Sequence, residues 1–160
     1  MALKRTRELK PLSSEHHQAL LLAFQLKKAL AGHAESAGAP KDLDGLVALA
    51  RRYEESVFTT HTAAEEELLG RHLAAGDMRR LQTEHSQMRR FLASARLAPP
   101  GERRQALLGF ADLLERHVRW EERELFPRCE EELGDEALAT LGQEIEKRLV
   151  LARAAASHRA

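Results

Sequence analysis

Histidine and glutamate recur along the chain in two short patterns that alternate. The first pattern is a glutamate directly before a histidine, with a glutamine two residues after that histidine, and it occurs at residues 15–18 and 84–87. The second pattern is His-x-x-x-Glu-Glu, and it occurs at residues 61–66 and 117–122. Imidazole nitrogen and carboxylate oxygen are ligands that suit iron, manganese and zinc. The alternation therefore predicts a metal site built from four parts of the chain.

The spacing within the second pattern suits an α-helix. Positions four apart on a helix lie ~40° and ~6 Å apart on one face. Each histidine can therefore bind one metal centre together with the first glutamate of its pattern. The second glutamate is five positions away and diverges by ~140°, so Glu66 and Glu122 are second choices.

Six side chains are the candidate metal ligands: His16, His61, Glu65, His85, His117 and Glu121. His17 is the alternative to His16, but His16 shares the register of Glu84-His85 and lies on the apolar stripe that Ala19 continues. Four imidazoles and two carboxylates directed into an apolar interior would each cost several kcal/mol if left unpaired. Six ligands exceed the four of a structural zinc, which favours two ions that share bridging carboxylates.

Helices are needed to position these residues, and the apolar pattern supplies them. Apolar residues recur at intervals of three and four over about residues 15–31, 44–73, 78–95, 102–126 and 136–154. Ser13 or Ser14 is the predicted N-cap of the first helix and Asp42 or Asp44 that of the second, and Pro127 is predicted to end or kink the fourth.

The predicted fold is all-α, an antiparallel up-down four-helix bundle with an additional C-terminal helix. Residues 1–12 form a basic and polar lead without an apolar face, residues 13–133 form the bundle, and residues 134–160 form the C-terminal helix and tail. A chain of 160 residues is long enough for one such domain.

Composition narrows the possible partners. Lys and Arg number 25 and Asp and Glu number 25, so the chain has no net field to attract nucleic acid or an anionic membrane surface. No apolar stretch approaches the ~20 residues that span a bilayer. Cys129 is the only cysteine and no secretory signature is present, which predicts a cytoplasmic protein. The ligand set contains no thiolate, so an iron–sulfur cluster is disfavoured.

These residues resemble the hemerythrin family, in particular bacterial hemerythrin-like proteins with a His-His-Glu cation-binding domain. The resemblance covers about residues 12–133 and includes Leu125-Phe126-Pro127 after the last motif. It implies a four-helix bundle that holds two non-haem iron ions with an oxo or hydroxo bridge. The iron ligands it implies are the same six side chains. It also implies a protein that binds, senses or reacts with a small diatomic ligand, oxygen or nitric oxide.

The third helix departs from the pattern of the oxygen carriers. Those proteins have His-x-x-x-His there, whereas Arg89 stands four residues after His85. A guanidinium cannot bind a metal, so one iron would keep a position for water or a small molecule, and reactivity is expected in place of simple carriage. An inward-pointing Arg89 would pair with Glu65 or Glu121, and the alternative is that Arg89 turns to solvent beside Arg90. The set of four histidines and two glutamates is more similar to family members linked to iron-centre repair and to nitric oxide.

Two alternative functions remain. One is an iron donor for the repair of damaged iron centres, and the other is a zinc-stabilised helical interaction module without chemistry. Other classes lack their motifs: no histidine has a glutamate three places before it, as ferritin-like oxidases require, and neither His-Glu-x-x-His nor a phosphate-binding glycine loop occurs.

Overall fold

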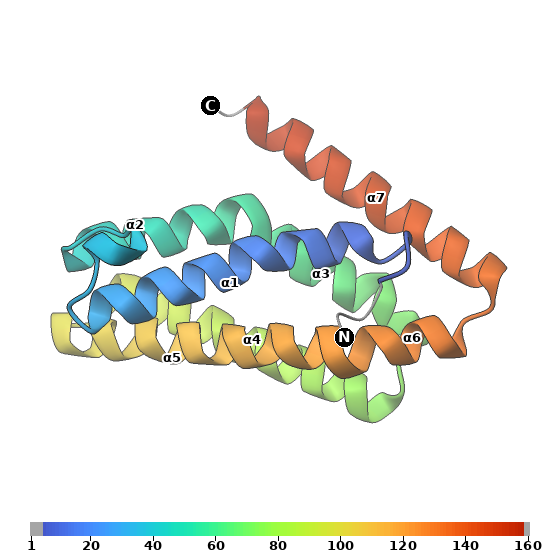
Figure 1. The fold of residues 1–160 in the computed structure, drawn as a ribbon, viewed down its shortest axis with the longest axis horizontal. Coiled ribbons are helices and arrows are strands. Elements are labelled where there is room, and N and C mark those ends of the chain that lie inside the picture. Colours follow the sequence, from blue (N-terminus) through green and yellow to red (C-terminus); the bar gives the residue numbers. More distant parts are fainter. Residues whose placement is uncertain (1–4, 159–160) are drawn as a thin grey trace.

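The computed structural model describes residues 5–158, so residues 1–4 of the predicted lead and 159–160 of the predicted tail lie outside the described residues. Every regular element within the described range is helical, which confirms the predicted all-α fold (Figure 1). The α-helices are α1 (Lys10–Leu30), α2 (Leu43–Tyr53), α3 (Thr59–Glu67), α4 (Ala75–Leu97), α5 (Pro100–Trp120), α6 (Phe126–Glu132) and α7 (Asp135–Ser157).

Local residue types account for several helix ends. α1 ends just before Gly32, whose φ of 89° favours glycine. Asp42 caps α2, because its side chain accepts a hydrogen bond from the backbone N–H of Gly45 at 2.7 Å. α5 begins at Pro100, slightly before the predicted start at about residue 102, because proline is tolerated at the first helical position, where its missing N–H would have no helical partner.

The N-terminal lead differs from the prediction. α1 begins at Lys10, with Pro11 in its first turn, so neither Ser13 nor Ser14 is the N-cap. Leu9 and Leu12 are fully buried, and they pack in the same cluster as residues of α7. The expectation that this segment has no apolar face is therefore wrong, because two leucines three positions apart are enough to anchor one turn.

Two π-helical turns interrupt the long helices beside the candidate metal ligands. One, Glu54–Phe58, joins α2 to α3 shortly before His61, and the other, Glu121–Leu125, joins α5 to α6. Such turns contain an extra residue and occur often at functional sites. Pro127 does not end the helical run, because it falls in the first turn of α6 directly after the π turn, where proline is tolerated.

Contacts between the helices bring the four motif-bearing segments together. α5 packs along both α1 and α4, while α2 contacts α1, α4 and α5, and α3 contacts α4 (Figure 1). All four motifs therefore lie on helices that touch one another.

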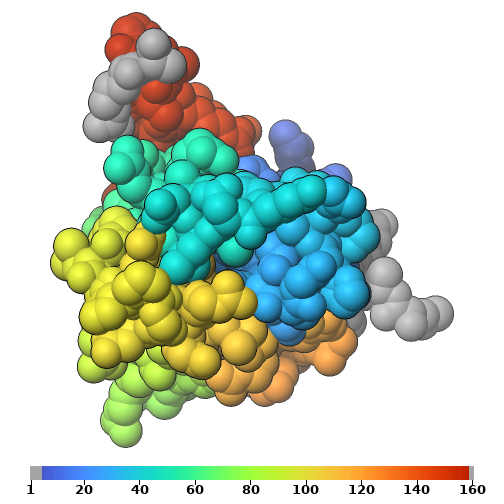
Figure 2. Space-filling view, turned by 90° about the vertical axis from the view of Figure 1, so that its left-hand side faces the viewer, coloured from blue at the N-terminus to red at the C-terminus, as the bar shows by residue number. Residues whose placement is uncertain are grey.

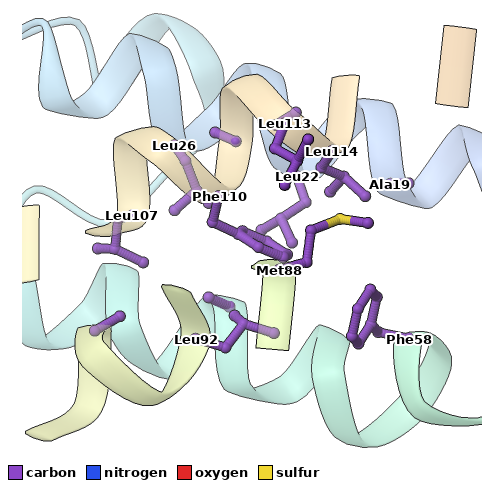
Figure 3. Close-up of a cluster of buried hydrophobic side chains, with 14 of the residues drawn as sticks. Ala19, Leu22, Leu26, Phe58, Met88, Leu92, Leu107, Phe110, Leu113 and Leu114 are labelled. Atoms are coloured by element: carbon purple, nitrogen blue, oxygen red, sulfur yellow. The ribbon is translucent and has the colours of Figure 1, made fainter. Parts of the chain in front are cut away.

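Two apolar clusters lie on either side of the motif residues. One cluster joins α1, α2, α4 and α5, and Figure 3 shows its centre around Leu26, Met88 and Phe110. The other joins the start of α1 with α3, α6 and α7, and it includes Leu81 and Phe126. His16, His61 and His85 each fall between a residue of one cluster and a residue of the other. The candidate ligands thus form a buried polar layer between apolar ones.

α7 packs on this body through its N-terminal half. Leu138, Leu141, Ile145 and Leu149 are buried, whereas Val150 and Leu151 are exposed. The end of α7 stands out from the rest of the molecule in the end-on view, where the connections between α1 and α2 and between α4 and α5 cover the near face (Figure 2). Within residues 5–158 no helix is both long and apolar enough to cross a membrane.

Candidate metal centre

The six candidate ligands are all buried and meet in one place. His16 comes from α1, His61 and Glu65 from α3, His85 from α4, His117 from α5 and Glu121 from the π turn that follows α5. The four histidines are at most 6% exposed, and Glu65 and Glu121 are fully buried. Their nitrogen and oxygen atoms form two groups, each of which could hold one metal ion.

The first group, which we call the His16/His61 half, contains two facing imidazoles. Nε2 of His16 lies 3.1 Å from Nε2 of His61. Oε1 of Glu65 lies 2.9 Å from the His61 nitrogen, and Oε2 of Glu121 lies 3.2 Å from the His16 nitrogen. Two nitrogens and two oxygens therefore converge on one point.

The second group, the His85/His117 half, repeats this arrangement. Nε2 of His85 lies 3.0 Å from Nε2 of His117. The other oxygen of each carboxylate completes the half: Oε2 of Glu65 is 3.3 Å from His85, and Oε1 of Glu121 is 3.0 Å from His117. Each carboxylate thus offers one oxygen to each half, as a bridging ligand does.

Protein groups alone do not satisfy these atoms. All four carboxylate oxygens of Glu65 and Glu121 are buried and accept no hydrogen bond. Each pair of facing Nε2 atoms can share only one proton. Buried, unpaired carboxylates are costly, and a cation in each half would remove that cost. The residues present therefore fit two metal ions with nitrogen and oxygen ligands.

A second set of carboxylates, the outer carboxylates Glu15, Glu66, Glu84 and Glu122, faces the other ring nitrogen of each histidine. Nδ1 lies 2.6 Å from Glu122 in His16, 2.7 Å from Glu66 in His85 and 2.6 Å from Glu84 in His117. Nδ1 of His61 lies 3.5 Å from Glu15. Such contacts orient a metal-bound imidazole and raise its basicity.

The outer carboxylates connect the four segments in a closed order. Glu15 of α1 faces His61 of α3, and Glu66 of α3 contacts His85 of α4. Glu84 of α4 then contacts His117 of α5, and Glu122 after α5 contacts His16 of α1. In each Glu-His or Glu-Glu pair, one residue therefore lies in the centre. The other is an outer carboxylate that contacts a central histidine of the next segment.

Arg89 does not enter the centre. Its guanidinium donates to Oε1 of Glu66 at 2.9 Å and to the hydroxyl of Thr62 at 3.4 Å, and its side chain is 44% exposed. Of the two orientations considered for Arg89, the inward one with Glu65 or Glu121 is therefore wrong, and the side chain lies at the surface beside Glu66. The physical reason is that Glu66, at the rim, reaches the guanidinium without the desolvation that the buried centre would impose.

The charges of the protein alone favour protonated histidines. Burial lowers the pKa of His61 and of His117, but the nearby carboxylates outweigh burial and raise the pKa of His61 to about 9 and that of His117 to about 10. Burial raises the pKa of Glu122, but hydrogen bonds from His16, Ser13 and Arg5 lower it to about 2. The Cys129 thiol is buried, which raises its pKa to about 12, so it stays protonated.

A small cavity adjoins the centre. Its volume is about 10 Å³, and its lining includes Tyr53, Phe58, Met88 and Leu114 as well as all four central histidines and Glu121. Burial, followed by the charges of nearby carboxylates, raises the pKa of the Tyr53 hydroxyl. The cavity has room for about one water-sized molecule.

The structure brings together the six side chains that the sequence singled out as candidate ligands. The structure places His16 in the centre and leaves His17 exposed, and it places Glu121 in the centre with Glu122 outside it. His33 and His158 are exposed. Among the outer carboxylates, Glu66 and Glu122 were considered only as second-choice ligands, and Glu15 and Glu84 were not considered, although the recurrence of a glutamate beside each central residue was the available signal. Arg5 gave no signal, because it precedes the first helix.

Comparison with known proteins gives one match. A family model described as "Hemerythrin HHE cation binding domain" matches residues 7–129. The matched range contains all six candidate ligands and all four outer carboxylates. No similar sequence among curated proteins and no similar solved structure was found.

Proposed function

The chain belongs to the hemerythrin HHE cation-binding domain family, and on that premise we propose that its buried centre holds two non-haem iron ions that bind, sense or react with oxygen or nitric oxide. The ligands in this proposal are His16, His61, Glu65, His85, His117 and Glu121. One observation carries it: Glu65 and Glu121 each direct one oxygen toward each of two histidine pairs.

Iron is preferred over a single zinc ion because of the number and arrangement of donors. A structural zinc uses four ligands, whereas six donors shared between two positions suit a pair of ions bridged by carboxylates. Two bound iron ions would supply one-electron chemistry toward a diatomic ligand. The protein's own part is to fix the imidazoles through the outer carboxylates, and to keep bulk water away from a centre whose carboxylates are fully buried.

The cavity beside the centre supports the proposal that the ligand is a small molecule. It has room for about one water-sized molecule, and Phe58, Met88 and Leu114 make part of its wall apolar. Arg89 is not among the residues that line it and pairs with Glu66 instead, so its side chain does not occupy the place of a further histidine ligand. We also propose the family's antiparallel up-down arrangement for the four helical runs, with α7 as the additional C-terminal helix. The contacts of α5 along α1 and α4 support it.

Metal analysis of purified protein tests the proposal. Protein produced with iron available is expected to hold about two iron ions per chain and to absorb in the near ultraviolet. Glu65→Gln removes one bridging charge and is expected to lose most of the iron. Glu67→Gln is the matched control, because Glu67 lies on the same helix but is exposed, and it should retain wild-type iron.

Two outcomes would contradict the proposal. Zinc in place of iron, in colourless protein, would indicate the helical interaction module without chemistry. Protein without any metal, whose melting is unchanged by a chelator, would indicate that the centre holds no ion at all.

A further inference from the structure

The outer carboxylates are not held alike. Glu66, Glu84 and Glu122 each form an ion pair with an arginine, in each case at 2.9 Å. Glu15 is buried, and within residues 5–158 it forms no ion pair with arginine or lysine. Its Oε1 and the Nδ1 of His61 that it faces both lack a hydrogen bond. His61 is therefore the least firmly oriented of the four central histidines.

The other histidine of the same half depends on the segment that precedes α1. Arg5 donates to the backbone oxygen of Glu122 at 2.7 Å and to its carboxylate at 2.9 Å. Its guanidinium also lies over the ring of Phe126, 5.1 Å from the centroid, and that ring stacks on His16. Arg5 thus reaches His16 by two routes, through Glu122 and through Phe126.

The His85/His117 half is supported from within the helices. Arg80 and Glu84 form an i,i+4 pair on α4, and Arg89 of α4 pairs with Glu66 of α3. All four supporting residues therefore lie within α3 and α4. Both outer carboxylates of this half are held by an arginine, whereas in the His16/His61 half only Glu122 is.

From this difference we infer that the two metal positions are unequal: the ion in the His16/His61 half leaves first, and Arg5 is the positioning residue that controls its release. The inference rests on the proposed two-iron centre and adds to it how the centre gives up iron. Mutation of a residue that contacts a metal ligand from outside typically lowers the metal affinity by about 10–100-fold. The half in which only one of the two outer carboxylates is paired with an arginine is thus the weaker.

A release experiment tests this inference on the full chain. Protein loaded anaerobically with ferrous iron is mixed with an excess of a coloured ferrous chelator, and the absorbance of the chelate is followed. Wild type is expected to release iron in two phases of one ion each. Arg5→Gln is expected to speed the fast phase about tenfold and leave the slow phase within about twofold. Arg89→Gln is expected to speed the slow phase and leave the fast phase unchanged.

Two further variants serve as controls. Arg79→Gln changes an exposed arginine beside Arg80 and should alter neither phase. Arg5→Lys keeps a cation beside Glu122 and should restore a fast phase close to wild type. A purely structural role of Arg5 would instead lower the melting temperature of Arg5→Gln and speed both phases together.

The outcomes separate the inference from the proposed function. Two ions released with a single rate constant, or an Arg5→Gln variant that speeds the slow phase as much as the fast one, would overturn the inference and leave the two-iron centre standing. Wild-type protein that binds no ferrous iron would overturn both.

Discussion

Glu122 lies 2.6 Å from Nδ1 of His16, although 106 positions separate the two residues in the sequence. In each helical segment an outer carboxylate contacts a central histidine of the next segment. The contact between Glu122 and His16 links the last segment back to the first. It also shows the role of the second glutamate in the His-x-x-x-Glu-Glu pattern, which lies outside the centre and contacts the outer ring nitrogen of a central histidine. Changes at the outer carboxylates should therefore affect metal binding without removing a ligand.

Glu122→Gln should weaken iron binding by about 10–100-fold. The amide keeps the size of the side chain but no longer offers a charged acceptor to His16. Competition with a chelator of known affinity measures the loss. Glu124→Gln, an exposed change two residues further on, should bind as tightly as wild type. Equal affinities for both variants would show that the contact with His16 does not support a ligand.

His16→Ala should lose much of the bound iron, whereas His17→Ala should retain it. His16 is buried within 3.2 Å of Glu121, while His17 is exposed on the outer face of α1. Iron content per chain, measured on both purified variants, distinguishes them. A greater loss of iron in the His17 variant would show that His17, and not His16, is the ligand from the first helix.

Protein without metal should be most stable between about pH 4.5 and 6.5. The pKa of His117 rises from its ordinary 6.5 to about 10 on folding, so its stabilisation is complete below pH 6.5 and is lost as pH rises toward 10. The pKa of Glu122 falls from 4.5 to about 2, so its stabilisation is complete above pH 4.5 and is lost as pH falls toward 2. Urea unfolding of metal-free protein at pH 3, 5.5 and 9 measures the profile, and a maximum at pH 9 would contradict it.

Iron affinity should rise with pH over the same range in which metal-free stability declines. The histidine nitrogens must lose their protons before they can bind a metal, so binding releases protons. Chelator competition at pH 6 and pH 8 measures the difference. An affinity that is higher at pH 6 would mean that these imidazoles are not ligands.

Removal of the metal should destabilise the fold. An ion that binds only the folded chain stabilises it by about 4 kcal/mol when its free concentration is 1,000 times the dissociation constant. Melting curves before and after dialysis against a chelator, at one pH and ionic strength, measure the effect. Identical curves would show that the buried carboxylates have some other partner.

The sequence predicted much of this centre because helical periodicity is a local property. The i,i+4 spacing of His61 with Glu65 and of His117 with Glu121 places each pair on one face whatever the remaining fold is. Periodicity also located the helices, and residue type narrowed the cap of the second helix to Asp42 or Asp44, of which Asp42 is the cap in the structure. Local spacing does not say which side chain of a neighbouring helix a residue meets.

The contacts that the sequence could not predict are those between segments. Glu84 and His117 belong to different helices, so their pairing depends on how α4 and α5 pack. The π turns at Glu54–Phe58 and Glu121–Leu125 carry no proline or glycine that would signal them. Arg5 lies in a polar segment whose sequence resembles a solvated lead, yet its guanidinium is held between Glu122 and Glu130.

The position of the ions tests the central claim most directly. Crystals of iron-loaded protein, with diffraction measured on both sides of the iron absorption edge, would locate each iron by its anomalous signal. Two peaks ~3.5–4 Å apart, one near Nε2 of His16 and His61 and the other near Nε2 of His85 and His117, with Glu65 and Glu121 between them, are the predicted result. A single peak, or peaks away from these residues, would contradict the two-iron centre.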